Sequence, residues 1–172
     1  MKQLFEMDLH DYEEGNAVFR RPSARAIILR EDGRIALVYS EKEHYYKFPG
    51  GGIHDDEEKK AALIREVKEE VGLTVIPETI QECGSVMRRQ KSNVNEHTIF
   101  EQENFYYTCQ TRKEVGEQNL DEYEAEAGFK LRYVTLGEAI QTNLDYKSDD
   151  YFDYIMIQRE AKVLQCVRNT VN

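Results

Sequence analysis

Three glutamates lie close together in the segment REVKEEVGL, which covers residues 65–73. Glu66, Glu69 and Glu70 stand at positions i, i+3 and i+4, which are neighbouring positions on the surface of a helix. Like charges at this spacing destabilise a helix by about 0.2–0.5 kcal/mol for each pair. Either this helix face is simply solvated, or a positive charge normally lies on it.

A glycine-rich segment, residues 50–52, comes shortly before the glutamates. Glycines let the backbone approach a ligand closely, and backbone carbonyl groups together with several carboxylates form a hard oxygen site suited to Mg²⁺ or Mn²⁺. Mg²⁺ commonly binds through one or two carboxylates and the phosphates of a substrate. The pattern therefore indicates a metal-dependent enzyme that acts on phosphate.

A helix that begins at Asp55 and stops at Gly72 is expected to carry the glutamates. Acidic residues in the first turn and a glycine at the end are typical helix signals. Ile64, Val67 and Val71 recur at the spacing i, i+3, i+7, so we expect them to pack against a sheet.

Strands are predicted on both sides of this helix. The segments 23–30 and 34–40 are strand-like, and the Asp-Gly step between them predicts a hairpin. Further strands are expected near 78–88, 103–113 and 128–135, with loops at 45–52, 89–102 and 114–127. A short helix follows at 136–144, and a final helix begins at Ser148 and packs onto the body. This order predicts a mixed sheet flanked by helices.

Composition limits the classes of protein and partner. The chain has 172 residues, which suits a single domain over residues 1–172. The net charge of −10 argues against binding to nucleic acid or to an anionic membrane. The N-terminus lacks the pattern of a signal peptide, and three widely spaced cysteines (Cys83, Cys109 and Cys166) are expected to be free thiols. We expect a cytoplasmic protein.

The segment from Gly51 to Leu73, GGIHDDEEKKAALIREVKEEVGL, resembles the Nudix box. The box has a glycine, five residues, a glutamate, seven residues, and then Arg-Glu-apolar-x-Glu-Glu-x-Gly-apolar. Nine positions of this chain match it: Gly51, Glu57, Arg65, Glu66, Val67, Glu69, Glu70, Gly72 and Leu73. The resemblance implies an α/β fold, a Nudix-like α/β/α sandwich with a mixed sheet. A C-terminal helix and the first twenty or so residues would be additions to it.

The resemblance also implies roles for the matching residues. Nudix enzymes hydrolyse a nucleoside diphosphate linked to another moiety, by attack of water on phosphorus. Glu66, Glu69 and Glu70 would ligate Mg²⁺, with Mn²⁺ as a substitute, and the backbone carbonyl of Gly51 or Gly50 would join them. Arg65 would orient a glutamate, and Glu57 would anchor the loop or lie in an outer metal shell. Bound cations would also let a protein of charge −10 hold a polyanion.

Family members often use one more glutamate, from a loop outside the box, as base or additional ligand. Glu124 and Glu126 lie just before the strand at 128–135 and are the preferred candidates, with Glu126 ahead. Glu96, Glu101 and Glu103 are rivals on the other loop.

Residues that select the substrate are less clearly marked. Tyr46, with Tyr45 and Phe48, could stack on a base or pack in a strand, and packing is the better expectation. Arg88 and Arg89 could contact phosphates or simply be solvated. The substrate is expected to be a small nucleoside diphosphate derivative. The family resemblance also makes a homodimer plausible.

Two alternatives remain at this point. One is a Nudix-fold binding or regulatory domain that has lost hydrolysis, which would usually show a broken box. The other is isomerisation of a diphosphate on the same fold, which would need a cysteine paired with a glutamate across a pocket. Cys83 and Cys109 lie on predicted strands, but nothing in the sequence places either in a pocket.

Overall fold

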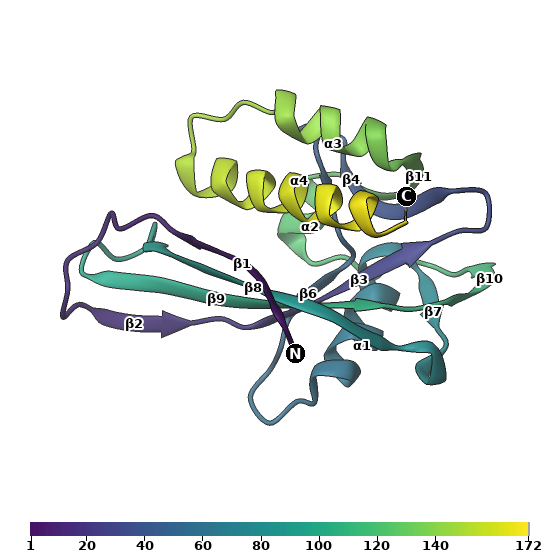
Figure 1. Cartoon of the computed structure of the whole chain (residues 1–172), viewed down its shortest axis with the longest axis horizontal. Coiled ribbons are helices and arrows are strands. Elements are labelled where there is room, and N and C mark those ends of the chain that lie inside the picture. Colours follow the sequence, from purple (N-terminus) through teal and green to yellow (C-terminus); the bar gives the residue numbers. More distant parts are fainter. Residues whose placement is uncertain (172) are drawn as a thin grey trace.

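The computed structural model describes residues 1–171, whose centre is a nine-stranded mixed sheet (Figure 1). Its strands are β1 (Gln3–Asp8), β2 (Ala17–Arg20), β3 (Ser23–Leu29), β4 (Arg34–Ser40), β5 (Tyr46–Lys47), β6 (Gly50–Gly52), β8 (Gln81–Lys91), β9 (Thr98–Thr108) and β11 (Phe129–Thr135). The main order is β1-β8-β9-β3-β4-β11, while β2, β5 and β6 pair with β9, β4 and β3. β3 runs parallel to β9 and antiparallel to β4. A separate pair joins β7 (Leu73–Val75) to β10 (Thr111–Val115).

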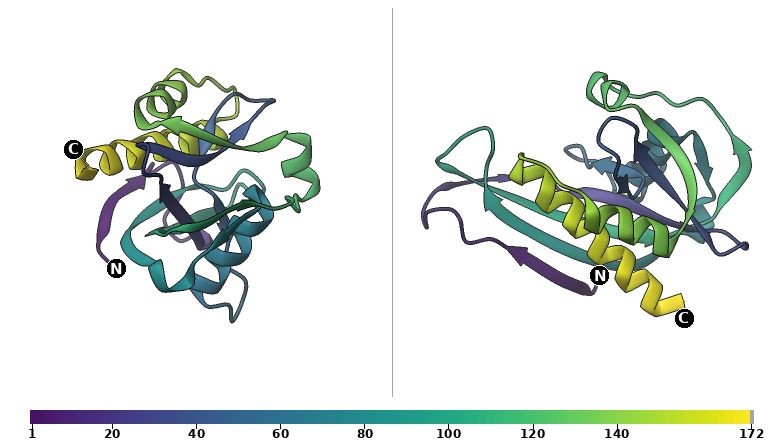
Figure 2. Two further views of the ribbon diagram at one scale, coloured as in Figure 1. Left: turned by 90° about the vertical axis from the view of Figure 1, so that its right-hand side faces the viewer. Right: turned by 90° about the horizontal axis from the view of Figure 1, so that it is seen from above.

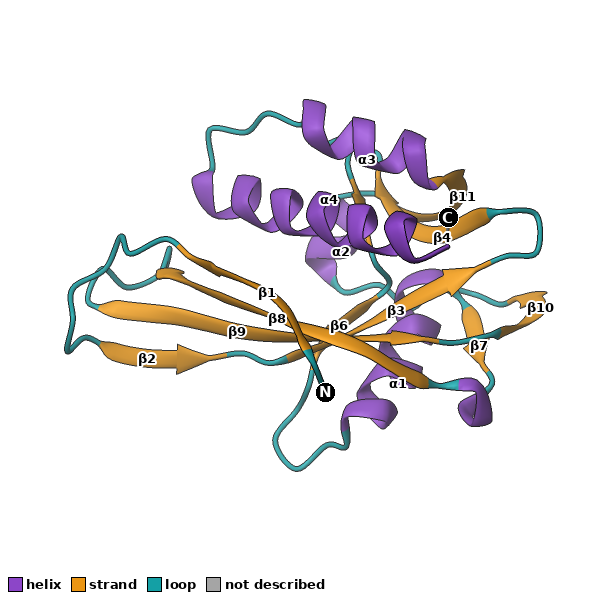
Figure 3. Cartoon of the chain, viewed as in Figure 1, coloured by secondary structure: helices purple, strands orange, loops and turns teal. Residues whose placement is uncertain are grey.

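Helices cover both faces of this sheet. The helix α1 (Lys59–Val71) lies on one face, and α3 (Leu136–Asp145) and α4 (Tyr151–Val171) lie side by side on the other (Figures 2 and 3). The α/β/α sandwich with a C-terminal helix is therefore confirmed. The β8–β9 hairpin, with β1 and β2 beside it, extends away from the helices (Figure 1).

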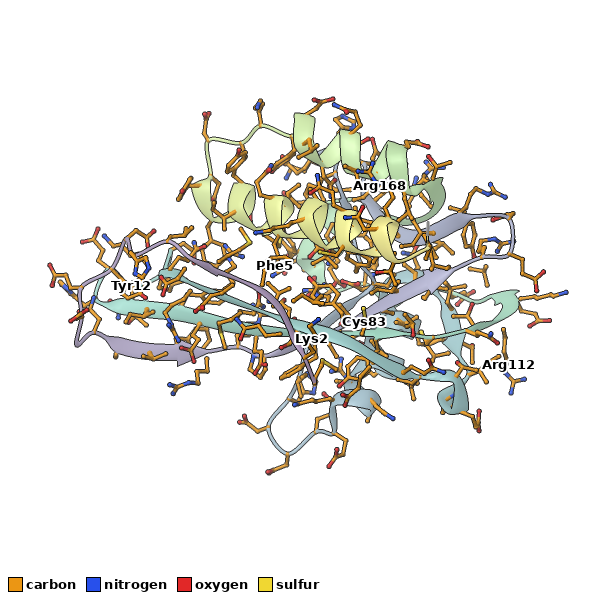
Figure 4. The ribbon with its side chains drawn as sticks, viewed as in Figure 1. Lys2, Phe5, Tyr12, Cys83, Arg112 and Arg168 are labelled. Atoms are coloured by element: carbon orange, nitrogen blue, oxygen red, sulfur yellow. The ribbon has the colours of Figure 1, made fainter. Side chains whose placement is uncertain are left out.

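Apolar side chains fill the space between these layers (Figure 4). Val67 and Val71 of α1 are fully buried, as predicted, whereas Ile64 is only partly buried and Leu63 takes a fully buried position instead. Ile157 and Leu164 of α4 are also buried, so the final helix does pack onto the body. The 3-10 turn Pro77–Thr79 leads from β7 into β8.

The segment 45–52 is not the open loop that its glycines predict. Tyr46 and Lys47 pair with β4, and residues 50–52 pair with β3. Gly50 has φ +137°, and a Cβ added there would overlap the carbonyl oxygen of Ala24. Only glycine can adopt this conformation at this distance from β3, so the glycine segment is held against the sheet.

Other boundaries also differ from the predictions. The helix α1 begins at Lys59 rather than Asp55, because Glu57 accepts a hydrogen bond from the His54 backbone at 3.0 Å and stabilises a loop there. The strands β8 and β9 extend into the predicted loop 89–102, so that only residues 92–97 connect them. A short helix, α2 (Glu122–Glu126), interrupts the acidic segment and is capped by reciprocal bonds between Asp121 and Glu124.

Cys83, Cys109 and Cys166 are free, as predicted. Within residues 1–171, no helix is both long enough and apolar enough to cross a membrane.

The close approach of Gly50 to β3 gives a test of this architecture. We expect Gly50→Ala to lower the free energy of unfolding by about 2 kcal/mol or more, because it combines a positive φ with a backbone overlap. Gly137→Ala is the matched control: its Cβ would meet nothing within 4 Å, and alanine favours the helix by up to about 1 kcal/mol. Urea unfolding measures both, and equal stabilities would contradict the assignment.

Candidate active site

A cavity of about 710 Å³ is bordered by the glycine segment, α1, α2 and the β8–β9 hairpin. One part of it, here called the glutamate end, is lined by Gly50, Gly51, Glu66, Glu70 and Glu124. Another part, here called the arginine end, is lined by Arg88, Phe100, Gln102 and Phe152. Each end combines residues from segments far apart in the sequence.

Glu70 is the most deeply buried carboxylate of the glutamate end, at 1% exposure. It accepts a hydrogen bond from the Gly50 backbone at 2.8 Å and pairs with the Lys47 ammonium group at 2.5 Å. Burial, followed by the neighbouring charge of Glu70, raises the pKa of Glu124 to about 7. Both carboxylates line the same end of the cavity.

Glu66 lies against the backbone of the glycine segment. A Cβ at Gly51 would overlap the Glu66 carboxylate, so the missing side chain is what allows the two to approach. Burial raises the pKa of Glu66, while Arg65 opposes this shift and Glu70 adds to it. The carbonyl of Gly50 accepts a hydrogen bond from Arg25, whereas Gly51 is paired with Ala24 of β3.

Arg65 connects the glutamates to the preceding loop. Its guanidinium group donates to Glu57 at 2.8 and 2.9 Å, to Glu66 at 2.7 Å, to Glu69 at 3.1 Å and to the Gly52 carbonyl at 3.1 Å. Bonds from Arg65 lower the pKa of Glu57 to about 2. Glu57 also accepts from the His54 backbone. These contacts tie the loop to α1 and hold Glu66 and Glu69 beside it.

Glu69 lies beside the same site without lining the main cavity. It borders an adjoining cavity of about 450 Å³ that shares Glu66 and Glu124 with the first. In the present arrangement, no three His, Cys, Asp or Glu side chains within residues 1–171 are grouped as metal ligands. Arg65 and Lys47 instead hold the carboxylates. The donor set nevertheless suits a hard cation, because carboxylates from two elements converge beside the Gly51 backbone.

The structure favours Glu124 over Glu126 as the additional glutamate. Glu126 is exposed and pairs with Lys42 at 2.8 Å, which draws it away from the cavity. Of the other candidates, Glu101 lies on β9 and pairs with Arg89 and Arg20. Glu96 is within 3.6 Å of Lys91, and neither Glu96 nor Glu103 lines the cavity.

Two of the three predicted substrate-binding residues lie elsewhere. Tyr46 is buried and packs against Tyr39, with ring centroids 4.9 Å apart, so the packing expectation holds for it. Arg89 pairs with Glu101 at 2.7 Å and with Asp8 at 3.3 Å. Because side chains alternate along a strand, Arg89 faces away from the cavity while Arg88 lines it.

Several residues of the site were missed in the sequence. Glu160 of α4 accepts the backbone N–H of Phe48 at 2.8 Å and pairs with Arg159 at 2.6 Å, so the final helix supports the glycine segment. Arg25 donates to the Gly50 carbonyl, and Lys47 pairs with Glu70, which accepts from the Gly50 backbone. The available signal was a charged residue within an otherwise apolar element, as Arg25 is in SARAIIL.

Comparisons with known proteins agree with this geometry. A family model described as "NUDIX domain" matches residues 19–155. An RNA pyrophosphohydrolase of Xylella fastidiosa (strain M12) is 35% identical over 65 residues, which are 38% of this chain and 33% of that protein. One from Marinomonas sp. (strain MWYL1) is 42% identical over 53 residues, 31% of this chain and 33% of that protein. The chain thus spans about a third of the length of these relatives.

A solved structure shares the fold. The NUDIX hydrolase from Nitrosomonas europaea superposes with a TM-score of 0.54 at 16% sequence identity, covering 82% of this chain and 89% of that one.

The bonds between Glu57 and Arg65 predict a pH-dependent contribution to stability. The folded-state pKa of Glu57, about 2, lies below the ordinary glutamate value, so the stabilisation is present above about pH 5 and is lost as the pH falls towards 2. We expect Glu57→Gln to be less stable than the wild type by about 1 kcal/mol at pH 7, with the gap closing at acid pH.

Urea unfolding at several pH values measures this gap. Glu58→Gln is the control, because Glu58 is the exposed neighbour and makes no ion pair within residues 1–171. A gap that stays constant from pH 7 to pH 3 would contradict the assigned ion pair.

Proposed function

Because the chain belongs to the Nudix family, we propose that it hydrolyses a pyrophosphate bond in a nucleoside diphosphate linked to another moiety, with Mg²⁺ or Mn²⁺ as cofactor. The observation that carries this proposal is the convergence of Glu66, Glu70 and Glu124 beside Gly51 at one end of a cavity. A cavity of about 710 Å³ is in the size range of small-molecule sites.

Glu66, Glu70 and the carbonyl of Gly50 or Gly51 would hold the cation, and Glu69 would add a ligand from the adjoining cavity. When bound, a divalent cation there neutralises phosphate charge and lowers the pKa of a bound water. Arg65 orients Glu66 and Glu69 by donating to both. Gly50 orients Glu70 through its backbone N–H.

Glu124 is the residue that we assign to proton transfer. It faces the cavity at the glutamate end, where a carboxylate can accept the proton of an attacking water. The water that attacks phosphorus gives its proton to the Glu124 carboxylate. The P–O bond of the anhydride then breaks, and the phosphate on its far side leaves.

A small molecule is a better substrate for this chain than RNA. The relatives named for RNA pyrophosphohydrolysis match over about a third of their length, and a net charge of −10 repels a polynucleotide.

The first test is a panel of nucleoside diphosphate derivatives assayed for phosphate or monophosphate release with Mg²⁺ and with Mn²⁺. We expect at least one substrate, no measurable activity in Glu70→Gln, and a fall in kcat of about 100-fold or more in Glu124→Gln because the base is lost. Glu126→Gln should lower kcat by less than about threefold. Far-UV circular dichroism checks that each variant is folded.

Different outcomes separate the alternatives. If the protein hydrolyses no compound of the panel and binds no divalent cation, the enzyme assignment is overturned and a binding domain is favoured. A loss of activity in Glu126→Gln but not in Glu124→Gln would restore the order expected from the sequence.

Cation binding gives a second test that does not depend on turnover. At a Mg²⁺ concentration 100 times its Kd, binding to the folded state adds about 2.7 kcal/mol, which raises the Tm of a chain of this size by about 5–10 °C. We expect Glu66→Gln and Glu70→Gln to lose most of this shift, while Glu114→Gln, on the exposed strand β10, keeps it. A shift of equal size in all variants would place the cation elsewhere.

A further inference from the structure

Arg88 at the arginine end is a buried cation without an anionic partner. It is 1% exposed, yet no carboxylate within residues 1–171 lies at ion-pair distance from it. Its Nε donates to Gln90 at 2.8 Å and its Nη2 donates to the Phe152 carbonyl at 2.6 Å. Burial, followed by the charge of Arg159, lowers the pKa of Arg88 to about 9. A buried charge of this kind favours a ligand that accepts hydrogen bonds.

Gln102 presents a second donor beside Arg88. The two residues are direct partners in the β8–β9 register, and both line the cavity. The carbonyl oxygen of Gln102 accepts a bond from Arg159 at 2.8 Å, and Arg159 is itself fixed by Glu160. This bond sets the orientation of the amide, so its NH₂ group remains for the cavity. The arginine end therefore offers donors from both residues.

Aromatic rings form the walls around these donors. The Phe152 ring centroid lies 4.1 Å from the Arg88 guanidinium carbon, and the Phe100 centroid lies 5.5 Å from it. Phe19 also lines the cavity and lies 6.3 Å from Phe100, centroid to centroid. Apolar walls with donors at one side suit a flat ring that carries hydrogen-bond acceptors on its edge.

The two ends of the cavity are far enough apart to bind different parts of one molecule. Gly51 pairs with Ala24, and Ala24 pairs with Phe105 on β9. Gln102 is three residues further along this strand, which corresponds to about 10 Å.

We infer that the arginine end binds the base of the nucleotide, and that Arg88 and Gln102 select a purine with two adjacent acceptors, O6 and N7, over adenine. Guanine and hypoxanthine both present this pair, whereas adenine presents a donor at position 6. The inference rests on the proposed function only in that the same molecule carries its diphosphate at the glutamate end.

The test measures the Kd of GMP, IMP and AMP by isothermal titration calorimetry without divalent cation. IMP isolates the O6/N7 edge, because it lacks the 2-amino group of GMP. We expect GMP and IMP to bind about 10-fold or more tightly than AMP, the discrimination expected when two hydrogen bonds read one base edge. In Arg88→Met the ratio should fall below about threefold.

Arg132→Gln is the control for loss of one positive charge, because Arg132 lies on β11 and contacts Glu41 at 3.6 Å. It should keep the wild-type ratio. Equal affinities of the wild type for IMP and AMP, or no binding of any of the three, would overturn the inference. An equal loss for all three nucleotides in Arg88→Met would also overturn it, by assigning Arg88 to phosphate or ribose.

Because no hydrolysis is measured, this result is separate from that of the substrate panel. A protein that prefers IMP to AMP but hydrolyses nothing would overturn the proposed function and retain the base subsite.

Discussion

The geometry of the candidate site depends on ion pairs that hold like charges together. Glu66, Glu69 and Glu70 project from one helix, where they repel one another. Arg65 donates hydrogen bonds to Glu66 and Glu69, and Lys47 pairs with Glu70. These contacts keep the carboxylates in place beside the glycine segment. In this arrangement no three His, Cys, Asp or Glu side chains within residues 1–171 are grouped as metal ligands.

The glycine segment is held from three directions. The strand β3 pairs with residues 50–52, Glu70 of α1 accepts from Gly50, and Glu160 of α4 accepts from Phe48. Burying the ion pair of Arg159 and Glu160 would cost free energy without the bonds that Glu160 accepts from Phe48 and Arg159 donates to Gln102. The C-terminal helix is consequently part of the support of the site as well as a cover for the sheet.

Local patterns made much of this molecule predictable. The Asp-Gly hairpin, the apolar spacing of α1 and the Nudix box each depend on residues close in sequence, and the structure places them as expected. The choice between Glu124 and Glu126 depends on which side of a short helix faces the cavity, and Lys42 decides it from 84 residues away. The roles of Lys47 and Glu160 depend likewise on long-range packing, which spacing along the chain does not encode.

The strand β9 runs without interruption beneath both ends of the cavity, from Thr98 to Thr108. Because each residue of a strand adds a nearly constant rise, β9 fixes the distance between Gln102 and the level of Gly51. A one-residue insertion within it would turn the following side chains to the opposite face, so the spacing cannot change in small steps. A change in the turn at residues 92–97 would alter the cavity wall that residues 92–95 form and would leave this distance unchanged. The base subsite proposed at the hairpin can thus be altered while the backbone fixes its distance to the glutamates.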